Sequence, residues 1–215
     1  MARATCPVAA GLLAAGLLLA LPAAAQQGEW RLGGRVLSVK TDETIEPLAV
    51  LDCRLAFDDS WTIELDATYM LDHQLGLEWT ITSAPHNLTA VGGVWDRLEV
   101  GEVWIAQSTL TIAYEVPLWG RWRPYLGLGV GGAYLHSSDI TAPGIRSIDS
   151  DLIAGAVGRI GVAYRYENRW ILTLDLRYGR YSGEVRIEAS DGTTSDRLAT
   201  DLEPMLIGLG VAYRF

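Results

Sequence analysis

Apolar and polar residues alternate along most of the chain, and the pattern is clearest at its end. In residues 201–215 every second position is apolar, and small residues plus Arg214 fill the gaps. Residues 61–71 repeat the pattern, with Thr62, Glu64 and Asp66 between the apolar positions. A spacing of two predicts β-strands with one apolar face. No helical pattern follows residue 201 that would cover the apolar face of the last strand, which is typical of a strand that faces lipid.

The same reading along the chain predicts eight strands. They span residues 30–39, 61–71, 75–83, 102–116, 122–136, 151–166, 170–185 and 201–215. The short connections are 72–74, 117–121 and 167–169, and the long ones are 41–60, 84–101, 137–150 and 189–200. Short turns at one end and long loops at the other are typical of outer-membrane barrels. Residues 50–57 are expected to be a loop extension; the alternative makes them a barrel strand and puts 75–83 in a long loop.

The second face of these strands decides between a barrel and a β-sandwich. It combines glycines with charged residues that we expect to face the barrel interior: Glu64, Asp66, Glu78, Glu115, Arg159, Arg165, Asp175 and Arg177. A sandwich would leave this face in water, where glycine only weakens a strand. A narrow closed sheet gives glycine a use, because eight strands leave room only for side chains inside. The prediction is an all-β, eight-stranded antiparallel up-and-down transmembrane β-barrel, with arginines and carboxylates paired inside.

Tryptophan and tyrosine are placed near the predicted strand ends. Trp30, Trp119, Trp122, Trp170, Tyr166 and Phe215 fall at the short turns. Another group is expected to gather at the opposite mouth: Trp61, Trp79, Trp95 and Trp104. Such rings suit the two membrane–water interfaces, because one part of the ring is apolar and the other can remain wet.

The first 25 residues carry Arg3, an apolar run and a small-residue stretch ending at Ala25. This predicts a secretory signal peptide over 1–25 and a single barrel domain over 26–215. The net charge of −9 argues against nucleic acid as a partner. Three scattered histidines and one cysteine after the leader have no metal-ligand spacing, so we expect no cofactor or metal.

Four stretches in order resemble the OmpW family of small outer-membrane proteins. Residues 123–130 (RPYLGLGV) are similar to its "RPYxGxGxxY" strand, and residues 170–178 to its "W-x-x-x-x-D-x-R-Y" strand. Residues 69–87 resemble its strand, turn, strand and "A-x-P-x-x-H" region, and residues 203–215 its "P…GxGYRF" end. The chain departs at Trp104-Ile105-Ala106, where the family shows Leu-Pro-Pro, and at His86, which follows Pro85 directly. The resemblance implies the outer membrane and passage of small hydrophobic molecules.

We therefore expect a non-enzymatic channel that admits small hydrophobic solutes at the aromatic mouth and releases them inward or sideways into lipid. Its expected partners are outer-membrane lipid and lipopolysaccharide, small hydrophobic solutes, and the assembly machinery, which would read Phe215 and the last strand. One alternative is a closed structural or adhesive barrel. Another is a lipid A-modifying hydrolase built on His136 and Ser138, with Asp139 or Asp151 orienting the histidine.

Overall fold

The computed structural model describes residues 28–40, 44–48, 53–57, 59–91, 99–118, 120–141, 145–167, 169–189 and 195–215. The predicted leader, Trp95 and Trp119 lie outside these residues. The strands are β1 (Glu29–Lys40), β2 (Thr44–Leu48), β3 (Cys53–Phe57), β4 (Ser60–Met70), β5 (Leu75–Val91), β6 (Glu99–Glu115), β7 (Trp122–Ile140), β8 (Ile145–Ser150), β9 (Ile153–Tyr166), β10 (Trp170–Ala189), β11 (Ser195–Leu202) and β12 (Met205–Arg214). The described part of the chain contains no helix of the length and apolarity that crossing a bilayer requires.

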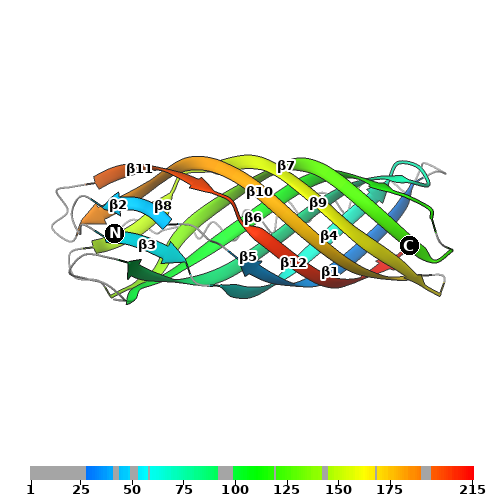
Figure 1. Ribbon diagram of the computed structural model, residues 1–215, viewed down its shortest axis with the longest axis horizontal. Helices are drawn as coiled ribbons and strands as arrows, with labels where there is room; N and C mark the ends of the chain where they lie inside the picture. The colour runs from blue at the N-terminus through cyan, green and yellow to red at the C-terminus, as the bar shows by residue number, and fades with distance from the viewer. Residues whose placement is uncertain are drawn as a thin grey trace, which may run out of the picture.

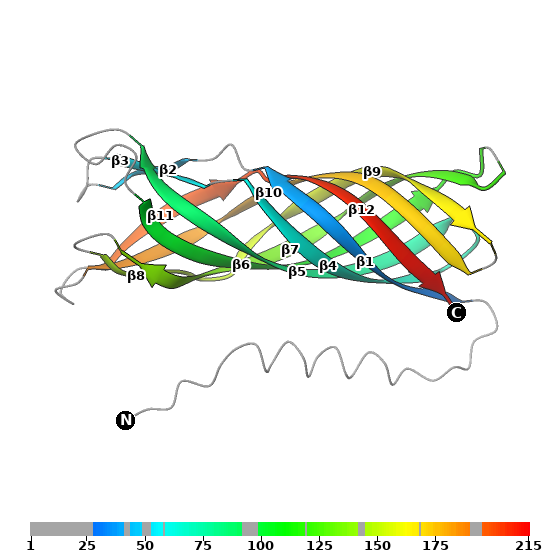
Figure 2. The ribbon, with the colours of Figure 1, turned by 90° about the horizontal axis from the view of Figure 1, so that it is seen from below.

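Eight strands form a closed antiparallel ring in the order β1, β4, β5, β6, β7, β9, β10 and β12, as Figures 1 and 2 show. β12 pairs with β1 to close it, and the Phe215 N–H donates to the Trp30 carbonyl at 2.9 Å. The predicted eight-stranded barrel is confirmed, and residues 75–83 belong to a ring strand, β5. β3 lies outside the ring and pairs with the far part of β5, so the described part of the predicted loop extension 50–57, residues 53–57, is not a ring strand; residues 50–52 lie outside the described residues.

The prediction of long irregular loops was wrong. β7 has 19 residues and β10 has 20, roughly twice the nine to eleven that a tilted strand needs to cross a membrane. β5 continues to Val91 and β6 begins at Glu99, so strand replaces most of the predicted loop 84–101. Main-chain pairing sustains this extension, in which β3 joins β5 while β8 and β11 join β10. We call this the extension end of the barrel; it lies opposite the C-terminus in Figure 2.

The opposite, or turn, end has compact connections with turn-forming residues. The Asp72 carboxylate accepts the N–H groups of Gln74 at 2.7 Å and Leu75 at 2.6 Å. These two hydrogen bonds hold the pKa of the Asp72 carboxyl below its ordinary value, because they favour the charged form. Gly120 and Glu167 adopt positive φ angles of 57° and 55° in the other two turns.

The outer surface of the ring is apolar over the half nearest the turn end. On β10, the outward side chains of Trp170, Leu172, Leu174, Leu176 and Tyr178 are all exposed, and the next outward residue is the charged Arg180. An exposed apolar face of this kind is typical of the lipid-facing surface of an outer-membrane barrel. We call it the apolar belt.

Aromatic rings gather at the turn end of the belt. Trp30 packs on Tyr69 with ring centroids 5.0 Å apart, and Trp122 on Tyr164 at 4.7 Å. Tyr213 contacts both Trp170 and Phe215. These rings form the girdle expected where the belt meets water.

Candidate functional site

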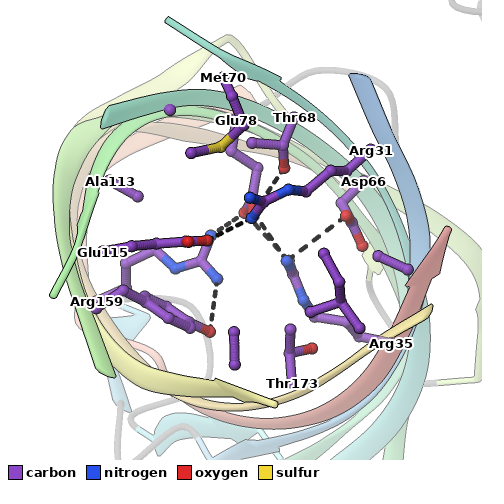
Figure 3. A pocket seen from close by; sticks show the side chains of 15 residues that line it. Arg31, Arg35, Asp66, Thr68, Met70, Glu78, Ala113, Glu115, Arg159 and Thr173 are labelled. Atoms are coloured by element: carbon purple, nitrogen blue, oxygen red, sulfur yellow. Dashed lines mark hydrogen bonds and ion pairs between the residues drawn. The ribbon is translucent and has the colours of Figure 1, made fainter. Parts of the chain in front are cut away.

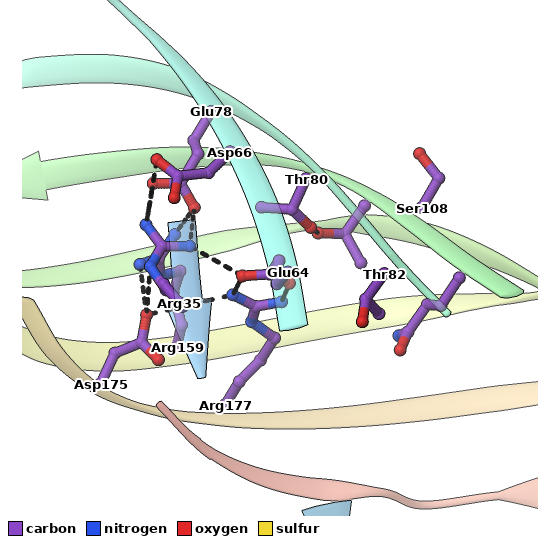
Figure 4. A network of polar contacts seen from close by, with 12 residues as sticks. Arg35, Glu64, Asp66, Glu78, Thr80, Thr82, Ser108, Arg159, Asp175 and Arg177 are labelled. Atoms are coloured by element: carbon purple, nitrogen blue, oxygen red, sulfur yellow. Dashed lines mark hydrogen bonds and ion pairs between the residues drawn. The ribbon is translucent and has the colours of Figure 1, made fainter. Parts of the chain in front are cut away.

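Charged side chains fill the barrel interior at the level where the belt surrounds it. We call the set the charged plug: Arg35, Glu64, Asp66, Glu78, Arg159, Asp175 and Arg177 (Figure 4). They come from β1, β4, β5, β9 and β10, each from the inward face of its strand. Every member is buried, and the Glu64 side chain is 0% exposed. Charges removed from water in this way are tolerable only when paired and hydrogen-bonded.

Glu64 and Arg35 organise one side of the plug. Glu64 receives two hydrogen bonds from Arg177, at 2.6 and 3.0 Å, which is the fork geometry that makes arginine–carboxylate pairs strong. Arg35 donates to Glu64 at 2.9 Å and to Glu78 at 2.8 Å. Asp66 and Asp175 lie 3.6 and 3.7 Å from the Arg35 guanidinium. Arg35 is therefore the cation that connects four carboxylates.

Arg159 organises the other side. It donates to Glu78, to Asp175 at 2.5 Å and to the Tyr125 hydroxyl at 3.0 Å, and its guanidinium lies 4.9 Å from the centre of the Tyr125 ring. Tyr125 in turn donates to Asp175 at 3.2 Å. The ring fits inside because Gly161 faces it: a Cβ there would lie 2.5 Å from the Tyr125 hydroxyl and 2.6 Å from the Leu174 carbonyl oxygen. Glycine is thus required for close approach at this position.

A cavity lies between the plug and the turn end, and Figure 3 shows side chains pointing into it. Its volume is about 40 Å³, room for about three waters. Glu115 contacts Arg31 in its wall, and Arg165 approaches the other Glu115 oxygen at 3.4 Å. Arg31 also bonds Glu29 at 2.8 Å. This lower cavity is strongly polar.

The cavity on the other side of the plug has a different character. We call it the upper cavity; it also measures about 40 Å³. Its lining combines five polar side chains, Thr62, Thr82, His86, Gln107 and Tyr181, with the apolar Val39, Ala84, Ile105, Ala133, Leu202, Pro204 and Leu206. Beyond it, toward the extension end, most of the buried interior residues are apolar, including Val100, Val103, Leu135, Ile148, Ile153 and Val185, and Thr200 is also buried there. The interior thus changes from apolar to charged at the plug.

The residues predicted to face the interior are placed as follows. Glu64, Asp66, Glu78, Arg159, Asp175 and Arg177 form the plug, Glu115 lines the lower cavity, and Arg165 is part-exposed beside Glu115. Sequence reasoning missed Arg35 and Arg31, although both share a strand face with Gly33, the same mixture that identified the other inward faces. It also missed the apolar interior of the extension, because those segments were expected to be loops.

Three of the four tryptophans predicted at the outer mouth are described, and Trp95 lies outside the described residues. Trp61 and Trp104 are exposed on the outward faces of β4 and β6. Trp79 lies four residues from the start of β5, between Ala67 and Leu110, so it is within the belt. Its indole N–H donates to Ser108 at 2.8 Å, which satisfies a polar group at the lipid surface. Trp79 shares an outward face with Leu77 and Ile81, and this alternation is the sequence signal that places Trp79 on the lipid-facing belt and not at the mouth.

Among the described side chains, His136 is paired with a carboxylate that was not proposed for the hydrolase, Asp149. The His136 Nδ1 lies 2.7 Å from Asp149, and both side chains are exposed. The side chains of Ser138 and Asp139 lie outside the described set, and Asp151 approaches Arg186 at 3.6 Å. Among the described residues, no group of three or more histidine, cysteine or acidic side chains is placed to hold a metal ion.

Comparisons with known proteins agree with this architecture. An outer-membrane protein of Sinorhizobium fredii is 28% identical, covering 89% of this chain and 82% of its own length. The crystal structure of OprG from Pseudomonas aeruginosa superposes with a TM-score of 0.74 at 19% identity, over 88% of this chain and 96% of OprG. The structure of AlkL in lipid bilayers superposes at 0.69 with 21% identity, over 91% and 94%, and the AlkL of Ectopseudomonas oleovorans is 22% identical, covering 88% of this chain and 83% of AlkL.

The superpositions show the same barrel fold, and the relatives are named as outer-membrane proteins. The sequence model described as the OmpW family matches residues 26–215, which includes every described strand. With its apolar belt and closed ring, this chain belongs to the OmpW family and is a β-barrel protein of the outer membrane.

Proposed function

We propose that the barrel takes up small hydrophobic solutes from outside and releases them sideways into the outer membrane. The observation that carries the proposal is the change of interior character at the plug. Side chains such as Val103, Leu135 and Ile153 pack inside the extension, and the upper cavity follows. An apolar solute that enters between such side chains gains free energy by leaving water, at about 25 cal/mol per Å² of apolar area buried.

The plug opposes passage straight through the barrel. Its arginines and carboxylates are mutually hydrogen-bonded, and the cavities on either side hold only a few waters. Separating one buried ion pair costs about 3–5 kcal/mol, because a charge is left unpaired out of water. An apolar solute offers no hydrogen bond in return, so the axial route is unfavourable for it.

The proposed sideways route lies next to the upper cavity, where the pairing of β1 with β12 ends. The ladder between β1 and β12 ends at the pair Lys40 and Met205. Before Met205 the chain forms β11, which pairs with β10 as β12 does. Among the described residues β11 has no second strand partner, so the ladder with β1 is not continued there. Leu202, Pro204 and Leu206 line the upper cavity at this seam, and Met205 is the last outward apolar residue of β12 before Glu203. A solute leaving here would enter the belt's lipid without crossing the plug.

Solute uptake tests the proposal. We would reconstitute the protein into lipopolysaccharide-containing liposomes and follow entry of radiolabelled octane, with protein-free liposomes as the baseline. Ile105→Trp would fill the upper cavity, whereas Ala106→Trp adds the same ring on the outward face of the adjacent position. We expect wild type and Ala106→Trp to raise the rate above baseline and Ile105→Trp to abolish the increase. Equal rates for wild type and protein-free liposomes would refute uptake.

The same plug favours one competing function, a closed structural barrel without transport. That barrel would give octane entry at the protein-free rate while remaining fully folded on an unboiled detergent gel. Equal effects of Ile105→Trp and Ala106→Trp would likewise argue against a route through the upper cavity.

A further inference from the structure

Two of the polar side chains in the upper cavity bond to each other across it. Gln107 on β6 and Tyr181 on β10 reach across the lumen, and the Gln107 amide donates to the Tyr181 hydroxyl. We call them the polar pair. The uptake proposed above does not explain why an apolar passage contains them.

Tyr181, one member of the pair, is closely packed against the barrel wall. Tyr181 is 2% exposed and passes over two glycines: a Cβ on Gly131 would lie 2.8 Å from its hydroxyl, and one on Gly179 would lie 2.4 Å from its ring. Only glycine at these positions leaves room for the ring. A fixed polar group at a fixed depth is the usual means by which an apolar pocket orients a ligand.

The pair retains hydrogen-bonding capacity that its surroundings do not use. The Tyr181 oxygen accepts from Gln107, so the phenol O–H remains to donate. The Gln107 amide oxygen accepts no bond from the described residues, and it remains an acceptor. By contrast, the nearby hydroxyls of Thr62 and Thr82 bond the carbonyls of Ser83 and Ile63, at 2.7 and 3.1 Å. One donor and one acceptor therefore converge on the upper cavity.

The chamber provides no permanent positive charge for an ionised ligand. Its described lining contains no arginine or lysine, its ionisable side chains are His86 and Tyr181, and the plug arginines beneath it are bound to their own carboxylates. An ionised carboxylate would lose its hydration without a partner of opposite charge, which is far more costly than burying a neutral hydroxyl or carbonyl that is hydrogen-bonded. The volume of about 40 Å³ also fits a head group and not a whole solute.

We infer that the polar pair selects uncharged amphiphiles: molecules with an apolar tail and one neutral hydroxyl, carbonyl or ester group. The head group binds Gln107 and Tyr181, and the tail lies along the apolar interior toward Leu202 and the seam. This selectivity rests on the proposed uptake, and it names the substrate class of the same chamber.

Three solutes of one chain length separate the ideas: octane, 1-octanol and octanoate at pH 7.4, in the liposomes described above and corrected for protein-free entry. We expect the protein-dependent rate to be highest for octanol and lowest for octanoate. Replacing both polar groups together, Gln107→Leu with Tyr181→Phe, leaves no orphaned partner. In this variant octanol should lose about fivefold, which is about 1 kcal/mol at 1.4 kcal/mol per tenfold, and octane should be unchanged. Ala106→Ser, at the exposed outward position next to Gln107, is the matched control.

A second readout does not depend on transport. In lipid nanodiscs, octanol but not octane should shift the side-chain amide resonances of Gln107. Octanoate entering as fast as octanol, or a double variant that slows octane and octanol equally, would overturn the inference. Failure of wild type to accelerate any of the three solutes would instead refute uptake itself.

Discussion

Removing the charge of Glu64 is the most direct test of the plug. Glu64→Gln keeps the shape but cannot balance Arg177 and Arg35, which contact it through three hydrogen bonds of 2.6–3.0 Å. Both arginines are buried, and Arg177 has only a distant second carboxylate, Asp175 at 3.9 Å. Breaking a buried pair in this way costs about 3–5 kcal/mol. With a urea slope of about 2 kcal/mol per M, the unfolding midpoint should fall by about 2 M.

Urea unfolding in phospholipid vesicles, followed by the fluorescence of the tryptophans, measures this shift. The matched control is Glu203→Gln, the same chemical change at a carboxylate that is exposed where it meets Arg180 at 3.5 Å. Exposed pairs contribute about 0–1 kcal/mol, so the control should shift the midpoint by at most a quarter as much. A second variant, Glu64→Leu with Arg177→Met, removes both charges and should cost less than Glu64→Gln, since no unpaired guanidinium remains.

Two results would contradict the reasoning. A midpoint for Glu64→Gln as close to wild type as that of Glu203→Gln would mean that water reaches the plug and screens its charges. The double variant is also compared with its two single changes, Glu64→Leu and Arg177→Met. If its loss of stability equalled the sum of the two single losses, Glu64 and Arg177 would not be coupled, despite the two bonds between them.

Four further outcomes are expected. Because the plug closes the lumen, wild type should give no stable conductance step in planar bilayers, and regular steps would contradict a closed plug. Gly161→Ala should destabilise the barrel by about 1–3 kcal/mol, because its Cβ would overlap Tyr125, whereas Gly158→Ala, whose Cβ would meet only a side-chain atom at 3.8 Å, should be near neutral in the same urea assay. Because the pKa of the Asp72 carboxyl is depressed, its hydrogen bonds stabilise the fold above the ordinary pKa of 3.8, and this stabilisation is lost as the pH falls below it. The difference in urea midpoint between wild type and Asp72→Ala should therefore be constant from pH 7 to 5 and shrink toward pH 3. A difference independent of pH would refute the role of the carboxylate. Phe215→Ala should lower the amount of barrel in outer membranes, measured by fractionation, while refolding of the purified chain into vesicles is unchanged, if the assembly machinery reads this exposed terminal ring.

The belt-spanning parts of the strands were predictable because lipid on one side and a narrow lumen on the other impose a strict alternation. The run from Trp170 to Tyr178 shows this, as each outward residue is apolar or aromatic and three of the four inward ones, Thr173, Asp175 and Arg177, are polar or charged. The extension was not predictable in this way. Past the belt, water replaces lipid, the outward residues become polar, and a strand there resembles a loop in sequence. Only the pairing partner across the sheet, such as Trp104 opposite Pro85, shows that the strand continues.

The plug was predictable in composition but not in connectivity. Alternation identifies Glu64 and Arg177 as inward, yet they are far apart in the chain, and their pairing depends on the relative stagger of β4 and β10. Arg31 and Arg35 were overlooked although they alternate with Gly33 on one face of β1, the mixture that identified the other inward faces. The polar pair was invisible in the sequence, since the significance of Gln107 depends on Tyr181 lying across the lumen from it.

The joint between the first and last ring strands sets the order of events during biogenesis. β1 and β12 are the earliest and latest ring strands to leave the ribosome, and each is the other's neighbour in the finished wall. Until β12 arrives, β1 has an unpaired edge that can join another chain. The ring therefore cannot close before β12 has been made. A chain truncated by a single strand would retain two open edges, and we expect it to aggregate or be degraded before it reaches lipid.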